Sequence, residues 1–103
     1  MNRFFDELGR RFAGAAAERG DPIEAPTLDP AVAEQLLELA RVTAHTAERR
    51  FAPLASYMAG VAAERLRRSG PEDASDPAAV ASLIERVWTE LEATAPARED
   101  GAT

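Results

Sequence analysis

Residues 76–91 read DPAAVASLIERVWTEL and carry the clearest helical pattern in the chain. Asp76 and Pro77 are typical of a helix start, because the Asp side chain can accept from an unpaired amide and Pro lacks an amide at the position that needs none. Large apolar residues then recur every three or four positions, on one face of a helix. They are Val80, Leu83, Ile84, Val87, Trp88 and Leu91. We predict a helix over residues 77–95 that packs this face, with Trp88 as an anchor, on a core.

The pair Asp29 and Pro30 repeats the same start signal. An apolar stripe follows it, formed by Val32, Leu36, Leu39, Thr43 and Ala47. Pro53 removes an amide that a continuous helix would need and clashes with the preceding turn. The pattern therefore predicts a helix over residues 30–50, followed by a helix–Pro–helix corner.

Two further helices are predicted over residues 2–19 and 53–69, ended by Gly20 and by Gly70 respectively. The helix over 53–69 is apolar or small on most sides. We predict that its large residues face the core, namely Leu54, Tyr57, Met58, Val61 and Ala62. Its reverse face carries the small residues Ser56, Ala59, Gly60 and Ala63, which can pack centrally or present an interaction face. Arg65 falls within the apolar stripe, so we expect it to pair with an acidic residue of the last helix.

No stretch alternates in the way that predicts a β-strand. We therefore predict an all-α protein, a small four-helix bundle forming a single domain over residues 1–96. The segment 97–103 has nothing to bury and is expected to be a disordered tail.

The composition excludes many kinds of catalytic site. The chain has 103 residues, of which 46% are hydrophobic. Because 23 of these hydrophobic residues are Ala, few large side chains remain to line a deep pocket. It has no Cys and no Lys, so thiolate chemistry, zinc fingers, Schiff bases and the P-loop lysine are all excluded. We expect no enzymatic activity, no metal and no cofactor.

The charge is unevenly distributed along the chain. The net charge is −6, which disfavours nucleic acid as a partner. Residues 41–70 nevertheless sum to +4, so the middle of the chain can meet either its own acidic neighbours or an acidic ligand. No stretch has the length and hydropathy of a membrane span or a signal peptide. We expect a soluble cytoplasmic protein that does not act at a membrane.

His45 is the only histidine, and it lies between two arginines at helical spacing. Arg41, His45 and Arg49 are spaced i, i+4, i+8, so a continuous helix would align them as one cationic ridge able to bind an anion. The alternative is a solvated surface on which Glu38 and Glu48 pair with these arginines. Both interpretations stay open from the residues alone.

The segment LARVTAHTAERRFAPL, residues 39–54, together with Tyr57 and Gly60, resembles the core signature of a small actinobacterial helical domain family of unknown function. Members of that family occur alone or fused behind a molybdenum cofactor guanylyltransferase. The resemblance covers about residues 30–66. It implies an accessory role near molybdopterin-guanine dinucleotide biosynthesis, and it adds weight to the ridge around His45.

Three hypotheses follow for the function. The first is a non-enzymatic accessory or interaction domain, with a molybdenum cofactor guanylyltransferase as its partner. The second is a small carrier that binds an anion, a pterin or a nucleotide through Arg41, His45 and Arg49. The third is a structural homo-oligomer that associates through Ser56, Ala59, Gly60 and Ala63.

Overall fold

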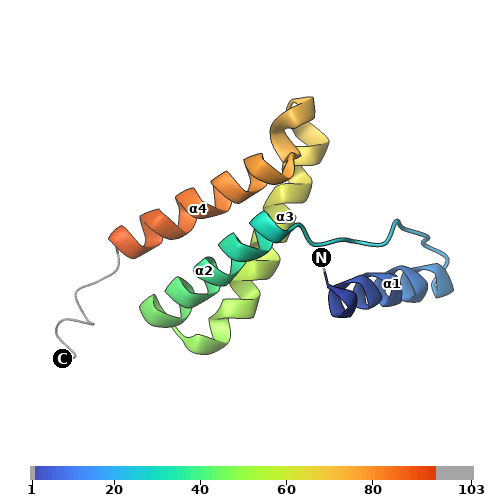
Figure 1. Cartoon of the computed structure of the whole chain (residues 1–103), viewed down its shortest axis with the longest axis horizontal. Helices are drawn as coiled ribbons and strands as arrows, with labels where there is room; N and C mark the ends of the chain where they lie inside the picture. Colours follow the sequence, from blue (N-terminus) through green and yellow to red (C-terminus); the bar gives the residue numbers. More distant parts are fainter. Residues whose placement is uncertain (1, 95–103) are drawn as a thin grey trace. The chain divides into compact units, whose positions relative to one another are not determined.

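The computed structural model describes residues 2–94 and contains four α-helices joined by irregular segments and two short 3₁₀ helices (Figure 1). In chain order these are α1 (Arg3–Glu18), α2 (Pro30–Thr46), η1 (Arg49–Phe51), α3 (Ala52–Ser69), η2 (Glu72–Ser75) and α4 (Pro77–Ala93). No β-strand occurs within residues 2–94. The prediction of an all-α protein with four helices is confirmed. The predicted tail, residues 97–103, lies outside the described residues.

The chain divides into two compact units, the first ending at Pro30 and the second beginning at Ala31. The first unit holds α1 and the segment that follows it. The second holds α2, α3 and α4 with the two 3₁₀ helices. The single domain that the sequence predicts over residues 1–96 stays a prediction.

In the first unit, local hydrogen bonds set both ends of α1. The Asn2 side chain accepts from the amide of Phe5 at 3.2 Å and caps the N-terminus. At the other end, Gly20 adopts a φ of 87°, which residues other than Gly rarely take. This turn lets the amide of Asp21 bond to the carbonyl of Ala16, as in a Schellman motif.

The segment after α1 returns along the helix and packs at Gly9. Gly9 is the buried residue of α1, and a Cβ built there would lie 2.2 Å from the carbonyl oxygen of Pro26. Only Gly permits this approach, because any side chain would overlap with the backbone. The neighbouring side chains Phe4 and Phe12 stay 66% and 57% exposed.

In the second unit, α2 begins at Pro30, as the Asp-Pro pair predicts, but it ends earlier than predicted. The last residue of α2 is Thr46 rather than Arg50. Glu48 has extended backbone angles, and Arg49–Phe51 then form η1. Pro53 prevents α2 from continuing past it, but it does not determine where α2 ends. Here Pro53 occupies the first turn of the next helix, α3, where a proline is tolerated.

The turn into α4 follows the predicted signals. Gly70 ends α3, and α4 begins at Pro77. Asp76 stands at the N-cap position, although its side chain makes no capping hydrogen bond. The chain thus runs along α3 to η2 and reverses into α4 (Figure 1).

The core of the second unit is small and lies where the three helices meet. Its buried centre consists of Leu39, Val80 and Ile84, and Trp88 packs against it, as the sequence predicts. Val42 is buried nearby, with 1% of its surface exposed. Few large side chains are fully enclosed, which agrees with the high Ala content. None of the helices in the described part is both long and apolar enough to span a bilayer.

Candidate functional site

The orientation of α3 is the reverse of the predicted one. Ala55, Ala59 and Ala63, spaced four residues apart on one face, pack against the core of the second unit. The large residues of the predicted core stripe face outward, with Tyr57 74% and Met58 70% exposed. The prediction that this stripe forms the core, and that Tyr57 anchors it, is wrong. Because the small face of α3 packs on the core, its large apolar stripe lies at the surface.

A groove lies beside this stripe, between α2, α3 and α4. Its volume is about 460 Å³, and its walls are almost entirely apolar. The lining residues are Leu39, Thr43, Thr46 and Ala47 of α2, Ala55, Met58, Ala59 and Ala62 of α3, and Leu83, Ile84, Val87 and Leu91 of α4. The size falls within the range of small-molecule and peptide side-chain pockets.

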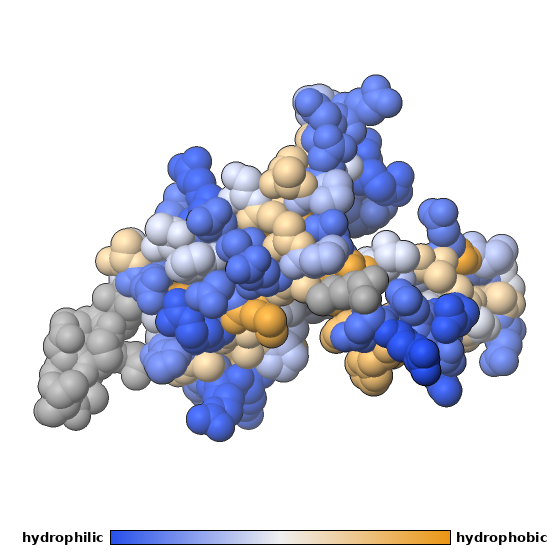
Figure 2. Space-filling view, viewed as in Figure 1, coloured by the Kyte–Doolittle hydropathy of each residue, from blue (hydrophilic) through white to orange (hydrophobic). Residues whose placement is uncertain are grey.

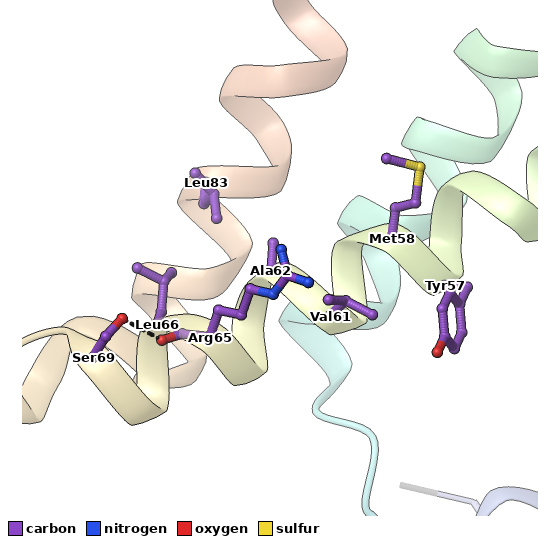
Figure 3. A pocket seen from close by; sticks show the side chains of 8 residues that line it. All are labelled: Tyr57, Met58, Val61, Ala62, Arg65, Leu66, Ser69 and Leu83. Atoms are coloured by element: carbon purple, nitrogen blue, oxygen red, sulfur yellow. Dashed lines mark hydrogen bonds between the residues drawn. The ribbon is translucent and has the colours of Figure 1, made fainter.

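A second hollow continues the first along α3. Both are lined by Met58, Ala62 and Leu83, and the second extends to Arg65 and Ser69 (Figure 3). We call the two together the α3 groove. Figure 2 shows that hydrophobic side chains lie open on the surface among hydrophilic ones. An exposed, concave and apolar surface of this kind is typical of a binding site.

Thr43 of α2 is one of the residues that line the α3 groove. The residue is 7% exposed, and its hydroxyl oxygen has no hydrogen-bond partner within residues 2–94. A buried hydroxyl without a partner is unfavourable, commonly by about 1–3 kcal/mol. The sequence places Thr43 correctly in the buried stripe of α2, but it does not identify this residue as part of a site.

Arg65 lies at the other end of the groove. Its side chain extends back along α3 toward Val61 and Ala62 (Figure 3). It makes no ion pair with any described carboxylate, so the predicted pairing with an acidic residue of the last helix is wrong. By contrast, Arg67 on the same helix pairs with Glu64 at 2.5 Å. The guanidinium of Arg65 is therefore available to an anionic group at the edge of the groove.

The structure does not align Arg41, His45 and Arg49 as a single ridge. Arg41 and His45 lie one turn apart on α2, whereas Arg49 lies beyond the end of that helix, on η1. Exposed residues at all three positions fit the solvated surface that the sequence left open. The continuous helix assumed for the ridge is interrupted because α2 ends at Thr46, and anion binding by these three residues stays a prediction.

Arg41 is also engaged with carboxylates. Its guanidinium lies 2.9 Å from a carboxylate oxygen of Glu38 and 3.6 Å from one of Glu92 on α4. The hydrogen bond that Arg41 donates to Glu38 is the main cause that raises the pKa of Arg41, and Glu92 adds to it. Arg41 thus links α2 to α4, and an anionic ligand would have to compete with two carboxylates.

The predicted interaction face of small residues is mostly used inside the second unit. Ala59 and Ala63 pack on the core, and Ser56 is half-buried. Gly60 alone of the four is exposed, with nothing within 4 Å of the position of a Cβ. The opposite face of α3, which carries Met58, is the one presented to the surroundings.

Acidic and imidazole groups do not gather into a metal site. Within residues 2–94, no three His, Asp or Glu side chains are placed so that they could hold a metal ion. Glu64 has a lowered pKa, mainly because Arg67 donates a hydrogen bond to its carboxylate. Arg67 has a raised pKa for the same reason. Glu64 and Arg67 thus form an exposed ion pair on the surface of α3.

Comparison with known proteins gives one match. A family model for a domain of unknown function, DUF6457, matches residues 1–99. No curated protein and no solved structure matches the chain. The matched range extends over α1 to α4 and thus over both compact units. The chain belongs to the DUF6457 family, whose function is unknown.

Proposed function

We propose that this chain is a non-enzymatic helical interaction domain that binds a partner protein through the α3 groove. The observation that carries the proposal is the reversed orientation of α3, which leaves Tyr57 and Met58 more than two-thirds exposed beside an apolar groove. Covering these side chains with a partner is favourable by about 25 cal/mol for each Å² of apolar surface that is removed from water.

The partner that we propose is a molybdenum cofactor guanylyltransferase, which would make the domain an accessory protein of molybdopterin-guanine dinucleotide biosynthesis. This part rests on the resemblance of residues 39–54 to a family found fused to that enzyme. Fusion of two domains in one chain favours their interaction when they are encoded separately. The absence of Cys and Lys from the sequence supports a binding role over a catalytic one.

The experiment is a binding measurement between the purified chain and the guanylyltransferase of the same organism. We expect saturable binding that Met58→Glu weakens at least about tenfold, because the new carboxylate would be buried without a partner. The matched control is Leu37→Glu on α2, since Leu37 is 71% exposed and Met58 is 70% exposed, and Leu37 does not line the groove. Equal loss in both variants, or no binding by the unmodified chain, would contradict the proposal.

Calorimetric titration with GTP, GMP and molybdopterin tests the carrier hypothesis in the same preparation. Because Arg41 is paired with Glu38 and Glu92, we expect no saturable binding of these anions. Binding that His45→Ala and Arg49→Ala abolish would instead assign the function to α2 and η1. Dimers seen by light scattering and dissociated by Gly60→Glu would support a structural homo-oligomer.

A further inference from the structure

We propose that the occupant of the α3 groove is an acidic amphipathic helix of the partner protein, with its apolar stripe over Met58 and Ala62 and a carboxylate on Arg65. The inference rests on the proposed function as an interaction domain and names the element of the partner that is bound. It combines the shape of the groove and the charge of Arg65.

The shape of the groove fits a helix. It follows α3 from Ala55 to Ser69, which at 1.5 Å per residue is about 21 Å, or close to four helical turns. Ala55, Ala59 and Ala62 lie among larger residues on the α3 side of the groove, so side chains of a second helix can enter between those larger residues. Exposed Leu54 widens the apolar surface beyond the groove, next to Tyr57 in the groove lining. A helix covers such a width with residues at i, i+3, i+4 and i+7.

The charge of α3 favours an acidic occupant. The charged residues of α3 are Glu64, Arg65, Arg67 and Arg68, and the only carboxylate among them is paired with Arg67. Arg65 remains without a carboxylate at the groove edge. Asp or Glu on the bound helix would complete a charge-assisted pair there.

The same charge argues against a second copy of the chain. In a twofold symmetric contact the same patch meets itself, so two copies of Arg65 would enter the interface. The residues that line the α3 groove include no Asp or Glu to compensate them. A different chain with acidic flanks satisfies Arg65, whereas self-association does not.

The test uses two synthetic helical peptides of about 18 residues with the same Leu and Ala stripe, one flanked by Glu and the other by Lys. Fluorescence anisotropy measures their binding to the full chain. We expect the Glu peptide to bind at least about tenfold more tightly than the Lys peptide, and Arg65→Glu to abolish this preference. Arg68→Glu is the matched control, because it makes the same charge change on α3 outside the groove lining. Met58→Glu should weaken both peptides.

Several results would overturn the inference. Equal binding of the two peptides, or equal effects of Arg65→Glu and Arg68→Glu, would remove the role of charge. Saturable binding of palmitate that depends on Met58 would assign the groove to an acyl chain, and dimers that Met58→Glu dissociates would assign it to a second copy. If the guanylyltransferase binds through Met58 and neither peptide is preferred, the proposed function stands and the acidic helix fails. If the Glu peptide binds through Arg65 while the guanylyltransferase does not, the acidic helix stands and that partner fails.

Discussion

Trp88 of α4 donates a hydrogen bond from its indole Nε1 to Oε1 of Gln35 on α2, across 2.7 Å. The two residues lie 53 positions apart in the chain, so this bond and the adjacent core contacts fix α4 against α2. Trp88 combines an apolar ring on the core with a polar atom that needs a partner, which Gln35 supplies. α4, held in this position, forms one wall of the α3 groove.

We expect Gln35→Ala to lower the free energy of unfolding by about 1–2 kcal/mol, because it leaves the partly buried indole N–H without its partner. Trp88 is the only tryptophan, so urea unfolding of this variant can be followed by its fluorescence. A double-mutant cycle with Trp88→Phe, followed by circular dichroism, isolates the pair. Strictly additive effects would show that the bond contributes nothing of its own.

Gly9→Ala and Gly14→Ala should have opposite effects on the first unit. At Gly9 a methyl group would overlap with the carbonyl oxygen of Pro26, so we expect a loss of about 1–3 kcal/mol. At Gly14 nothing lies within 4 Å, and Ala should stabilise α1 by about 0.5–1 kcal/mol. Amide hydrogen exchange along α1 measures both. Faster exchange in both variants, or in neither, would contradict the packing of Pro26 on α1.

The sequence predicted where the helices begin much better than which way they face. Pro30 and Pro77 start α2 and α4 as expected, because a proline start signal acts through local backbone geometry. The end of α2 was missed, since Pro53 sets only a latest position for it. For that reason Arg49 lies on η1 and not on the same helix as Arg41 and His45.

The face that α3 buries could not be predicted from periodicity alone. The helix carries two apolar stripes, one large and one small, and each has helical spacing. Burial of the larger stripe is the usual outcome, yet the smaller Ala55 and Ala59 are the residues that pack on the core here. Which effect prevails depends on α2 and α4, whose positions the sequence of α3 does not contain. The α3 groove exists because α3 buries its small face and leaves its large apolar face at the surface.

The pair of Glu64 and Arg67 should make a pH-dependent contribution to stability. Because Arg67 lowers the pKa of Glu64, the folded state holds the carboxylate charged at pH values where the unfolded chain begins to bind a proton. The contribution is thus present above the usual pKa of Glu and is lost as the pH falls through the lowered value. NMR titration of the Glu64 carboxyl measures this, and Arg67→Gln should return its pKa toward the usual range. An unchanged titration in that variant would exclude Arg67 as the cause.

Ala59→Glu and Met58→Glu separate the two possible orientations of α3. Ala59 is partly buried against the core formed by Leu39, Val80 and Ile84, so a carboxylate there would be partly desolvated without a partner and should cost about 1–3 kcal/mol. Met58 is 70% exposed, so the same substitution should change stability by less than about 1 kcal/mol. Chemical denaturation followed by the fluorescence of Trp88 measures both. The orientation expected from residue size alone predicts the opposite order, and finding that order would invalidate the α3 groove together with every proposal that rests on it.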